Sequence, residues 1–187
     1  MYFCVVHYPK IDTTKIEEIR QEYDPTHSLI KPHLTLVFPI KSTEVDFEML
    51  KSHLTNIALN TKPFDLEIGG FEKSWDNWLF LGTKAGSRDI NTLHDKLYSG
   101  ILEPHWRKDL PFSPHISLGQ FNQEGTNYNV EKPTQVAFDS QKYKEALTKA
   151  ERLNLDFHTE VDKITLITLN DEISQVIDSV DFPFKNQ

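Results

Sequence analysis

The sequence is poor in the residues that build disulfide-stapled, fibrous or membrane-spanning proteins. Its 187 residues include one cysteine, Cys4, which excludes an internal disulfide framework and a cysteine-based metal cluster. Seven glycines and ten prolines are too few for a collagen-like or low-complexity chain. The apolar run at residues 2–6 is too short for a signal peptide and is followed by His7. We therefore expect a cytoplasmic protein.

An excess of positive charge is also missing. The formal net charge is −8, with 20 Lys and Arg against 28 Asp and Glu. Proteins that hold long nucleic acid along a broad basic face depend on many contacts to phosphates. We therefore expect no extended nucleic-acid face and no membrane partner. Small substrates, or short ends of larger ones, remain compatible with this charge.

The remaining composition is that of an ordinary globular protein, with 38% hydrophobic and 11% aromatic residues. A chain of this length can bury about 70% of the surface that its unfolded form exposes, so it can fold without disulfides or metals. We predict one domain over residues 1–187, built from two approximate halves at 1–75 and 76–187, and we expect a monomer.

Two five-residue segments are nearly the same. Pro32-His33-Leu34-Thr35-Leu36 and Pro114-His115-Ile116-Ser117-Leu118 each read proline, histidine, branched apolar residue, hydroxyl residue, leucine. The histidines lie 82 positions apart (115 − 33), close to half of the chain. From average composition the pattern fits a given histidine by chance about once in a thousand. The pair is therefore specific, although either segment alone would be an ordinary strand.

The elements around these motifs repeat in the same order. In the first half we predict a strand at 2–7, a helix at 13–23, a motif strand at 33–38 ended by Pro39, a helix at 43–60 and a strand at 64–68. In the second half we predict a strand at 78–83, a helix at 87–97, a motif strand within 111–120, a helix from 140, and strands at 157–170 and 175–182. Residues 122–139 lack periodicity and are predicted to form a loop or a small insertion.

The motifs present an imidazole and a hydroxyl on one face of a strand. Because side chains alternate along a strand, His33 and Thr35 lie on the same side about 7 Å apart, and His115 and Ser117 repeat this arrangement. If the two halves pack with these faces opposed, two imidazoles flank one phosphate. The two hydroxyls then contact its non-bridging oxygens.

A histidine pair suits phosphodiester cleavage, which needs a base for the attacking oxygen and an acid for the leaving one. The hydroxyls of Thr35 and Ser117 would stabilise the charge that develops on the phosphoryl oxygens. Neither motif adjoins an HExxH, a DxD or a carboxylate cluster. We predict a catalytic set of His33, Thr35, His115 and Ser117 with no metal and no cofactor. Which histidine is the acid and which the base stays open.

The paired H-x-[ST]-apolar motifs resemble those of the 2H phosphoesterase superfamily, which includes the 2'-5' RNA ligase and cyclic phosphodiesterase families. The tract YDPTHSLIKPHLTL, residues 23–36, is similar to that of a bacterial branch of this superfamily. The resemblance implies an α+β fold of two pseudo-symmetric lobes, each an antiparallel sheet with outer helices, and an active-site cleft between the lobes. It also implies a hydrolase that cleaves 2',3'-cyclic or related nucleotide or RNA-end phosphodiesters without a metal, as in RNA processing, through the same four residues.

One departure from the family concerns substrate contacts. Many relatives have an arginine just after the second motif, whereas Gly119 and Gln120 follow Leu118 in this chain. RNA ligation and the identity of the substrate therefore stay open. We predict that Gln120, at this place, contacts the substrate, together with Phe38 and Phe121. Each of these aromatic residues lies five or six positions past a motif histidine and could stack on a base.

Two other interpretations are kept. A nucleotide- or RNA-binding module would have the same cleft with little or no catalysis, and would bind tightly without turnover. In a structural protein both motifs would be ordinary strand packing, and the two histidines would lie far apart.

Overall fold

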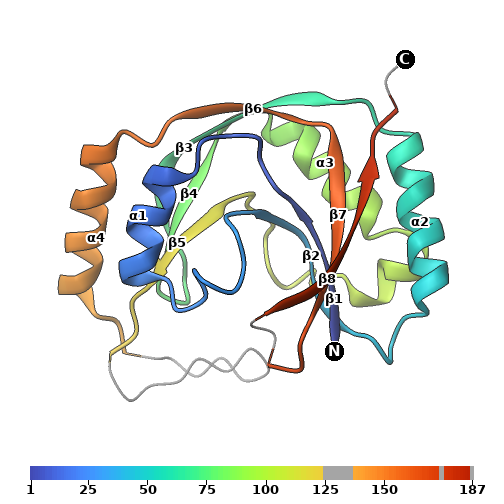
Figure 1. The fold of residues 1–187 in the computed structure, drawn as a ribbon, viewed down its shortest axis with the longest axis horizontal. Coiled ribbons are helices and arrows are strands. Elements are labelled where there is room, and N and C mark those ends of the chain that lie inside the picture. The colour runs from blue at the N-terminus through green and yellow to red at the C-terminus, as the bar shows by residue number, and fades with distance from the viewer. Residues whose placement is uncertain (124–136, 173–174, 186–187) are drawn as a thin grey trace.

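Two four-stranded antiparallel sheets form the centre of the molecule, with helices on its flanks (Figure 1). This computed structural model describes residues 1–123, 137–172 and 175–185. The predicted α+β fold with two pseudo-symmetric sheets is confirmed. The predicted loop at 122–139 lies mostly outside the described residues, but its two ends pair through a bridge between Asn122 and Phe138.

The first sheet carries the first motif at its edge. Its strands are β1 (Tyr2–His7), β2 (Leu34–Lys41), β7 (Lys163–Leu169) and β8 (Val176–Pro183). Their order across the sheet is β2-β1-β7-β8, and every neighbouring pair is antiparallel. The inner strand β1 is buried along almost its whole length, which explains its nearly continuous apolar sequence.

The second sheet repeats this plan around the second motif. Its strands are β3 (Phe64–Lys73), β4 (Trp78–Ala85), β5 (Ile116–Gln120) and β6 (Phe157–Val161). Their order is β5-β4-β3-β6, again antiparallel throughout. The motif strand is an edge strand in both sheets, and its neighbour is the first strand of the same half of the chain. The two motifs are thus presented in equivalent positions.

The sheets do not follow the predicted halves of the chain, 1–75 and 76–187. β3 from the first half lies in the second sheet, and β7 and β8 from the second half lie in the first sheet. The short turn at 74–77, with Asn77 in the left-handed region (φ 68°), joins β3 to β4. A short connection favours pairing of neighbouring strands because little loop entropy is lost. The division at residue 75 is therefore wrong for the sheets.

Four α-helices and one 3₁₀ helix cover the described part of the sheets. They are α1 (Thr14–Tyr23), α2 (Phe47–Leu59), α3 (Ser87–Leu97), η1 (Gly100–His105) and α4 (Ser140–Leu153). α1 and α4 lie side by side on one flank and α2 lies on the opposite flank (Figure 1). α1 also packs against β5. None of the described helices is long and apolar enough to cross a membrane.

Two strands differ from their predicted bounds. β2 continues through Pro39 to Lys41, because an edge strand can place a residue without an N–H on its unpaired side. The strand predicted at 157–170 is two strands, β6 and β7, separated by Asp162. At this residue the chain passes from the second sheet to the first, which no local periodicity indicates.

Candidate active site

Each motif places its histidine one residue before an edge strand. His33 precedes β2 and His115 precedes β5, and both imidazoles are half-buried, as are Thr35 and Ser117. The other motif positions are buried in both copies: Pro32, Leu34, Leu36, Pro114, Ile116 and Leu118. The predicted alternation, with histidine and hydroxyl on one side and aliphatic residues in the core, is therefore observed in both halves.

Both motif strands carry a β-bulge at the leucine that ends the motif. In the first sheet Thr35 pairs with Val6 and Val37 pairs with Val5, so Leu36 has no partner of its own. The second sheet repeats this register shift, because Ser117 pairs with Phe80 while Gly119 pairs with Leu79. A bulge inserts one residue and changes which side chains share a face.

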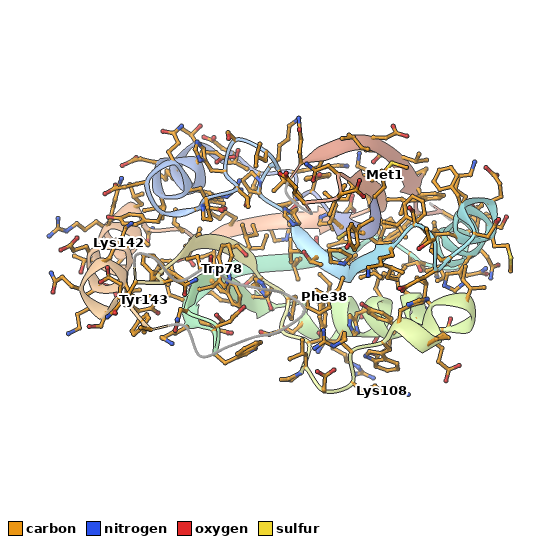
Figure 2. All side chains as sticks on the ribbon, turned by 90° about the horizontal axis from the view of Figure 1, so that it is seen from below. Met1, Phe38, Trp78, Lys108, Lys142 and Tyr143 are labelled. Atoms are coloured by element: carbon orange, nitrogen blue, oxygen red, sulfur yellow. The ribbon has the colours of Figure 1, made fainter. Side chains whose placement is uncertain are left out.

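Each bulge shifts the alternation of side chains along its strand. The third residue after the motif hydroxyl therefore lies on the same face as the histidine and the hydroxyl. Phe38 is the third residue after Thr35, and Gln120 is the third after Ser117. The two residues that follow each hydroxyl residue are buried: Leu36 and Val37 in β2, and Leu118 and Gly119 in β5. By contrast, Phe38 is exposed and Gln120 is half-buried. In the view from below, Phe38 and Trp78, the partner of Gln120, lie in the central region between the flanking helices (Figure 2). Phe38 and Gln120 are therefore structural equivalents.

Phe121, predicted as a substrate contact, lies elsewhere. Its side chain is 0% exposed and packs between the rings of Tyr23, at 5.6 Å, and Tyr143, at 5.3 Å. Because the bulge gives the site-facing position to Gln120, the next residue points into the core. In this structure Phe121 has no surface on which a base could stack, and the prediction of a stacking role is wrong for this conformation.

The two imidazoles are oriented by the same contact. Nδ1 of His33 lies 2.8 Å from the carbonyl oxygen of Lys31, and Nδ1 of His115 lies 2.6 Å from that of Ser113. A carbonyl oxygen only accepts, so Nδ1 donates in both residues. In the neutral ring Nε2 is then left unprotonated. Each histidine thus presents a nitrogen that can take up or, once protonated, deliver a proton.

The ring neighbours of the two histidines differ. Phe80 stacks on His115 with centroids 3.5 Å apart and planes at 17°. Tyr8 approaches His33 edge-on, with centroids 6.1 Å apart. One face of His115 is therefore covered by an aromatic ring, whereas the aromatic contact of His33 is with a ring edge.

The surroundings of His33 disfavour its charged form. The pKa of His33 is lowered from 6.5 to about 4, chiefly by burial and in smaller part by the charges of Arg20 and His115. The hydrogen bond to Lys31 and the carboxylate of Asp24 act in the opposite direction on this pKa. His33 is half-buried, so it is recessed in the protein rather than enclosed. The influence of His115 shows that the two histidines lie within electrostatic reach of each other.

His115 has anionic neighbours. Burial is the largest cause that lowers the pKa of His115 below 6.5. The hydrogen bond to the Ser113 carbonyl and the carboxylates of Glu72 and Asp76 raise this pKa. Glu72 and Asp76 were not predicted from the sequence. Only the pairing of β3, β4 and β5 brings β3 and the turn after it near the second motif.

Several polar groups of the site have no partner among the residues that the structure describes. Within the described part of the chain, the hydroxyls of Thr35 and Ser117 make no side-chain hydrogen bond. Nε2 of Gln120 is buried and also lacks a partner among the described residues. These groups can donate to a bound anion or to a polar ligand atom. The described residues include no group of three His, Cys, Asp or Glu that could hold a metal ion.

Comparison with known proteins identifies the family of the chain. The sequence matches the family model of the 2'-5' RNA ligase superfamily over residues 8–172. A Bacillus licheniformis protein with a provisional phosphoesterase name is 30% identical over 126 residues, which span 64% of this chain and 71% of that protein.

Two crystal structures have a similar fold. The protein TT0787 of Thermus thermophilus matches with a TM-score of 0.61 and 17% identity over 100% of both chains. LigT of E. coli, complexed with 3'-AMP, matches with a TM-score of 0.54 and 16% identity over 98% of this chain and 95% of that one. These structures show a shared fold, and the family-model match over residues 8–172 shows that the chain belongs to the 2'-5' RNA ligase superfamily of 2H phosphoesterases.

Proposed function

We propose that this protein is a metal-independent phosphodiesterase that opens 2',3'-cyclic phosphates of a small nucleotide or an RNA end. The observation that carries the proposal is the equivalence of His33 and His115. Both rings donate from Nδ1 to a backbone carbonyl, and both precede a half-buried hydroxyl residue at the edge of a sheet. Membership of a phosphoesterase superfamily supports the same chemistry.

The proposed reaction uses one histidine as base and the other as acid. The base takes a proton from water, whose oxygen attacks the phosphorus, and the bond from phosphorus to one ribose oxygen breaks. The acid gives its proton to that leaving oxygen, so the product is a phosphomonoester with a free ribose hydroxyl. Hydroxyls of Thr35 and Ser117 donate to the non-bridging oxygens as charge develops there.

Phe38 and Gln120 are the proposed substrate contacts beyond the phosphate. Phe38 is 42% exposed and offers a ring for a base, a contact that contributes about 1–3 kcal/mol. Gln120 offers an amide N–H with no partner among the described residues. The complex of LigT with 3'-AMP supports a nucleotide as the ligand of such a site. We expect Phe38→Ala and Gln120→Ala to raise KM more than they lower kcat.

The test is turnover of the four 2',3'-cyclic nucleotides and of a short RNA with a cyclic end. His33→Ala and His115→Ala should each lower kcat by about 10²- to 10⁴-fold, the usual contribution of a general acid or base. His158→Ala is the matched control, because His158 is exposed on β6 and its Nε2 lies 3.3 Å from a carboxylate oxygen of Asp65. EDTA should change nothing.

Turnover within a few-fold of wild type in both motif variants, or strict dependence on an added metal, would contradict the proposal. Tight nucleotide binding without turnover of any substrate in the panel would instead identify a nucleotide-binding module.

A further inference from the structure

We propose that Glu72 and Arg20 polarise the histidine pair in opposite directions, so that His115 carries the proton as general acid and His33 stays neutral as general base. Glu72 and Arg20 are positioning residues in this scheme, because each acts through a histidine. The inference rests on the proposed function and assigns the two roles that the motifs alone leave equal.

Two sets of contacts connect Glu72 to His115 indirectly. On the sheet, Glu72 of β3 pairs with Phe80 of β4, whose ring stacks on the imidazole. Through the loop before β5, Ser113 Oγ donates to Glu72 Oε2 at 3.3 Å, and the Ser113 carbonyl accepts from His115 Nδ1. A Cβ at Gly82 would lie 3.0 Å from Glu72 Oε1, so the glycine leaves room for the carboxylate.

The other groups that act on His115 favour its charged form. Asp76, in the turn between β3 and β4, is a second carboxylate whose charge stabilises an imidazolium. The face of the Phe80 ring at 3.5 Å adds a cation–π contact when the imidazole is protonated. Two anions and an aromatic face therefore favour the charged form of this histidine, against the effect of burial. His33 opposes them only when it is itself protonated.

Arg20 acts on His33 from α1. Its side chain is 2% exposed, donates from Nε to Asp24 at 2.8 Å and from Nη2 to the carbonyl of Ile30 at 2.8 Å. The next residue after Ile30 supplies the carbonyl that holds the imidazole of His33. Arg20 therefore fixes the segment that orients His33 and places a guanidinium near it.

Groups of both signs face His33, and the cations outweigh the anions. Asp24 favours a proton on His33 but is itself paired with Arg20, and Glu17 also bonds the same guanidinium. Tyr8 contributes a neutral ring edge. A proton on His115 then acts as a further cation against protonation of His33. Between the pKa values of the two histidines, the pair then holds one proton, on His115.

The proton path follows from this assignment. His33 Nε2 takes the proton of the attacking water, and His115 Nε2 gives its proton to the leaving ribose oxygen. The pair ends with the proton on His33, and exchange with solvent returns it to His115 before the next cycle. The acidic limb of kcat/KM then reports His33, and the basic limb reports His115.

Glu72→Gln tests the acid assignment. Glutamine keeps an acceptor for Ser113 but removes the charge, so the basic limb should move to lower pH by about half a unit, the effect of one charge near a protein surface. The acidic limb should stay in place. Glu67→Gln is the matched control, because Glu67 is exposed on the same strand and is not among the charges that act on His115.

Arg20→Gln tests the base assignment and should move the acidic limb to higher pH. If this buried variant does not fold, ring titration of wild type by NMR decides, with signals assigned from His33→Ala and His115→Ala. His115 should take up its proton at a higher pH than His33. A reversed order, or a Glu72→Gln profile equal to that of Glu67→Gln, overturns the inference while both histidines remain essential. Failure of the proposed function looks different, because neither histidine would then be needed.

Discussion

Gly119→Ala tests how the second motif strand is held against α1. Gly119 lies in the bulge of β5, two residues after the catalytic candidate Ser117. A Cβ added there would lie 2.5 Å from Cβ of Tyr23 and 3.0 Å from its carbonyl oxygen. Neither atom can rotate away, because both belong to the backbone or adjoin it at the last residue of α1. Relief therefore requires β5 and α1 to separate.

The expected magnitude follows from that distance. Non-bonded carbon atoms pack at about 3.5–4.0 Å, so the gap must open by roughly 1 Å. Overpacking of this kind costs about 1–3 kcal/mol of unfolding free energy. For a chain of this size, about 2 kcal/mol lowers Tm by roughly 4–8 °C. A displacement of about 1 Å at catalytic groups can cost up to about 10²-fold in rate. We expect kcat for a 2',3'-cyclic nucleotide to fall by at least about tenfold.

The assay compares thermal unfolding and steady-state turnover in Gly119→Ala and in Gly70→Ala. Gly70 has a φ of +78° with no atom within 4 Å of a built Cβ, so its substitution costs about 1 kcal/mol of backbone strain without any clash. This control should lose stability but keep its kcat. If Gly119→Ala melts at the wild-type temperature with an unchanged kcat, the contact between α1 and β5 does not position the site, and the reasoning fails.

Three further predictions concern buried groups. Asp24→Ala leaves the guanidinium of Arg20 buried with a weaker set of partners and should cost about 3 kcal/mol in urea unfolding. Burial lowers the pKa of His7, so the unfolded chain binds a proton more readily than the folded one, and the free energy of unfolding should fall as the pH drops below 6.5. His7→Leu should weaken this pH dependence, as measured by urea titrations at several pH values. Phe121→Ala should cost about 3–5 kcal/mol, whereas Phe38→Ala should cost less than about 1 kcal/mol, as measured by chemical denaturation.

Local pattern was enough to predict most of the secondary structure. The order strand, helix, motif strand, helix, strand occurs in both halves as predicted, because side-chain periodicity is a property of each segment alone. The split of 157–170 at Asp162 and the placement of β3 were not predicted. Both depend on which strands pair, and pairing is decided between segments that are distant in the sequence.

The predicted substrate contacts show that strand pairing also decides the position of single residues. Counting positions from each histidine makes Phe38 and Phe121 look alike. The bulges at Leu36 and Leu118 instead make Phe38 equivalent to Gln120 and bury Phe121. A bulge is a mismatch between two paired strands, so neither strand reveals it alone.

The sequence by itself determined which groups are candidates for catalysis, since two copies of proline, histidine, apolar residue, hydroxyl residue and leucine predict a paired site. The tertiary structure alone decided how the two copies differ. Strand pairing and the hydrogen bond from Ser113 bring the charge of Glu72 within reach of His115, and α1 carries Arg20, whose charge acts on His33. Electrostatic energy depends on distance in space rather than along the chain, so we expect the two similar motifs to differ in proton affinity only once the chain has folded.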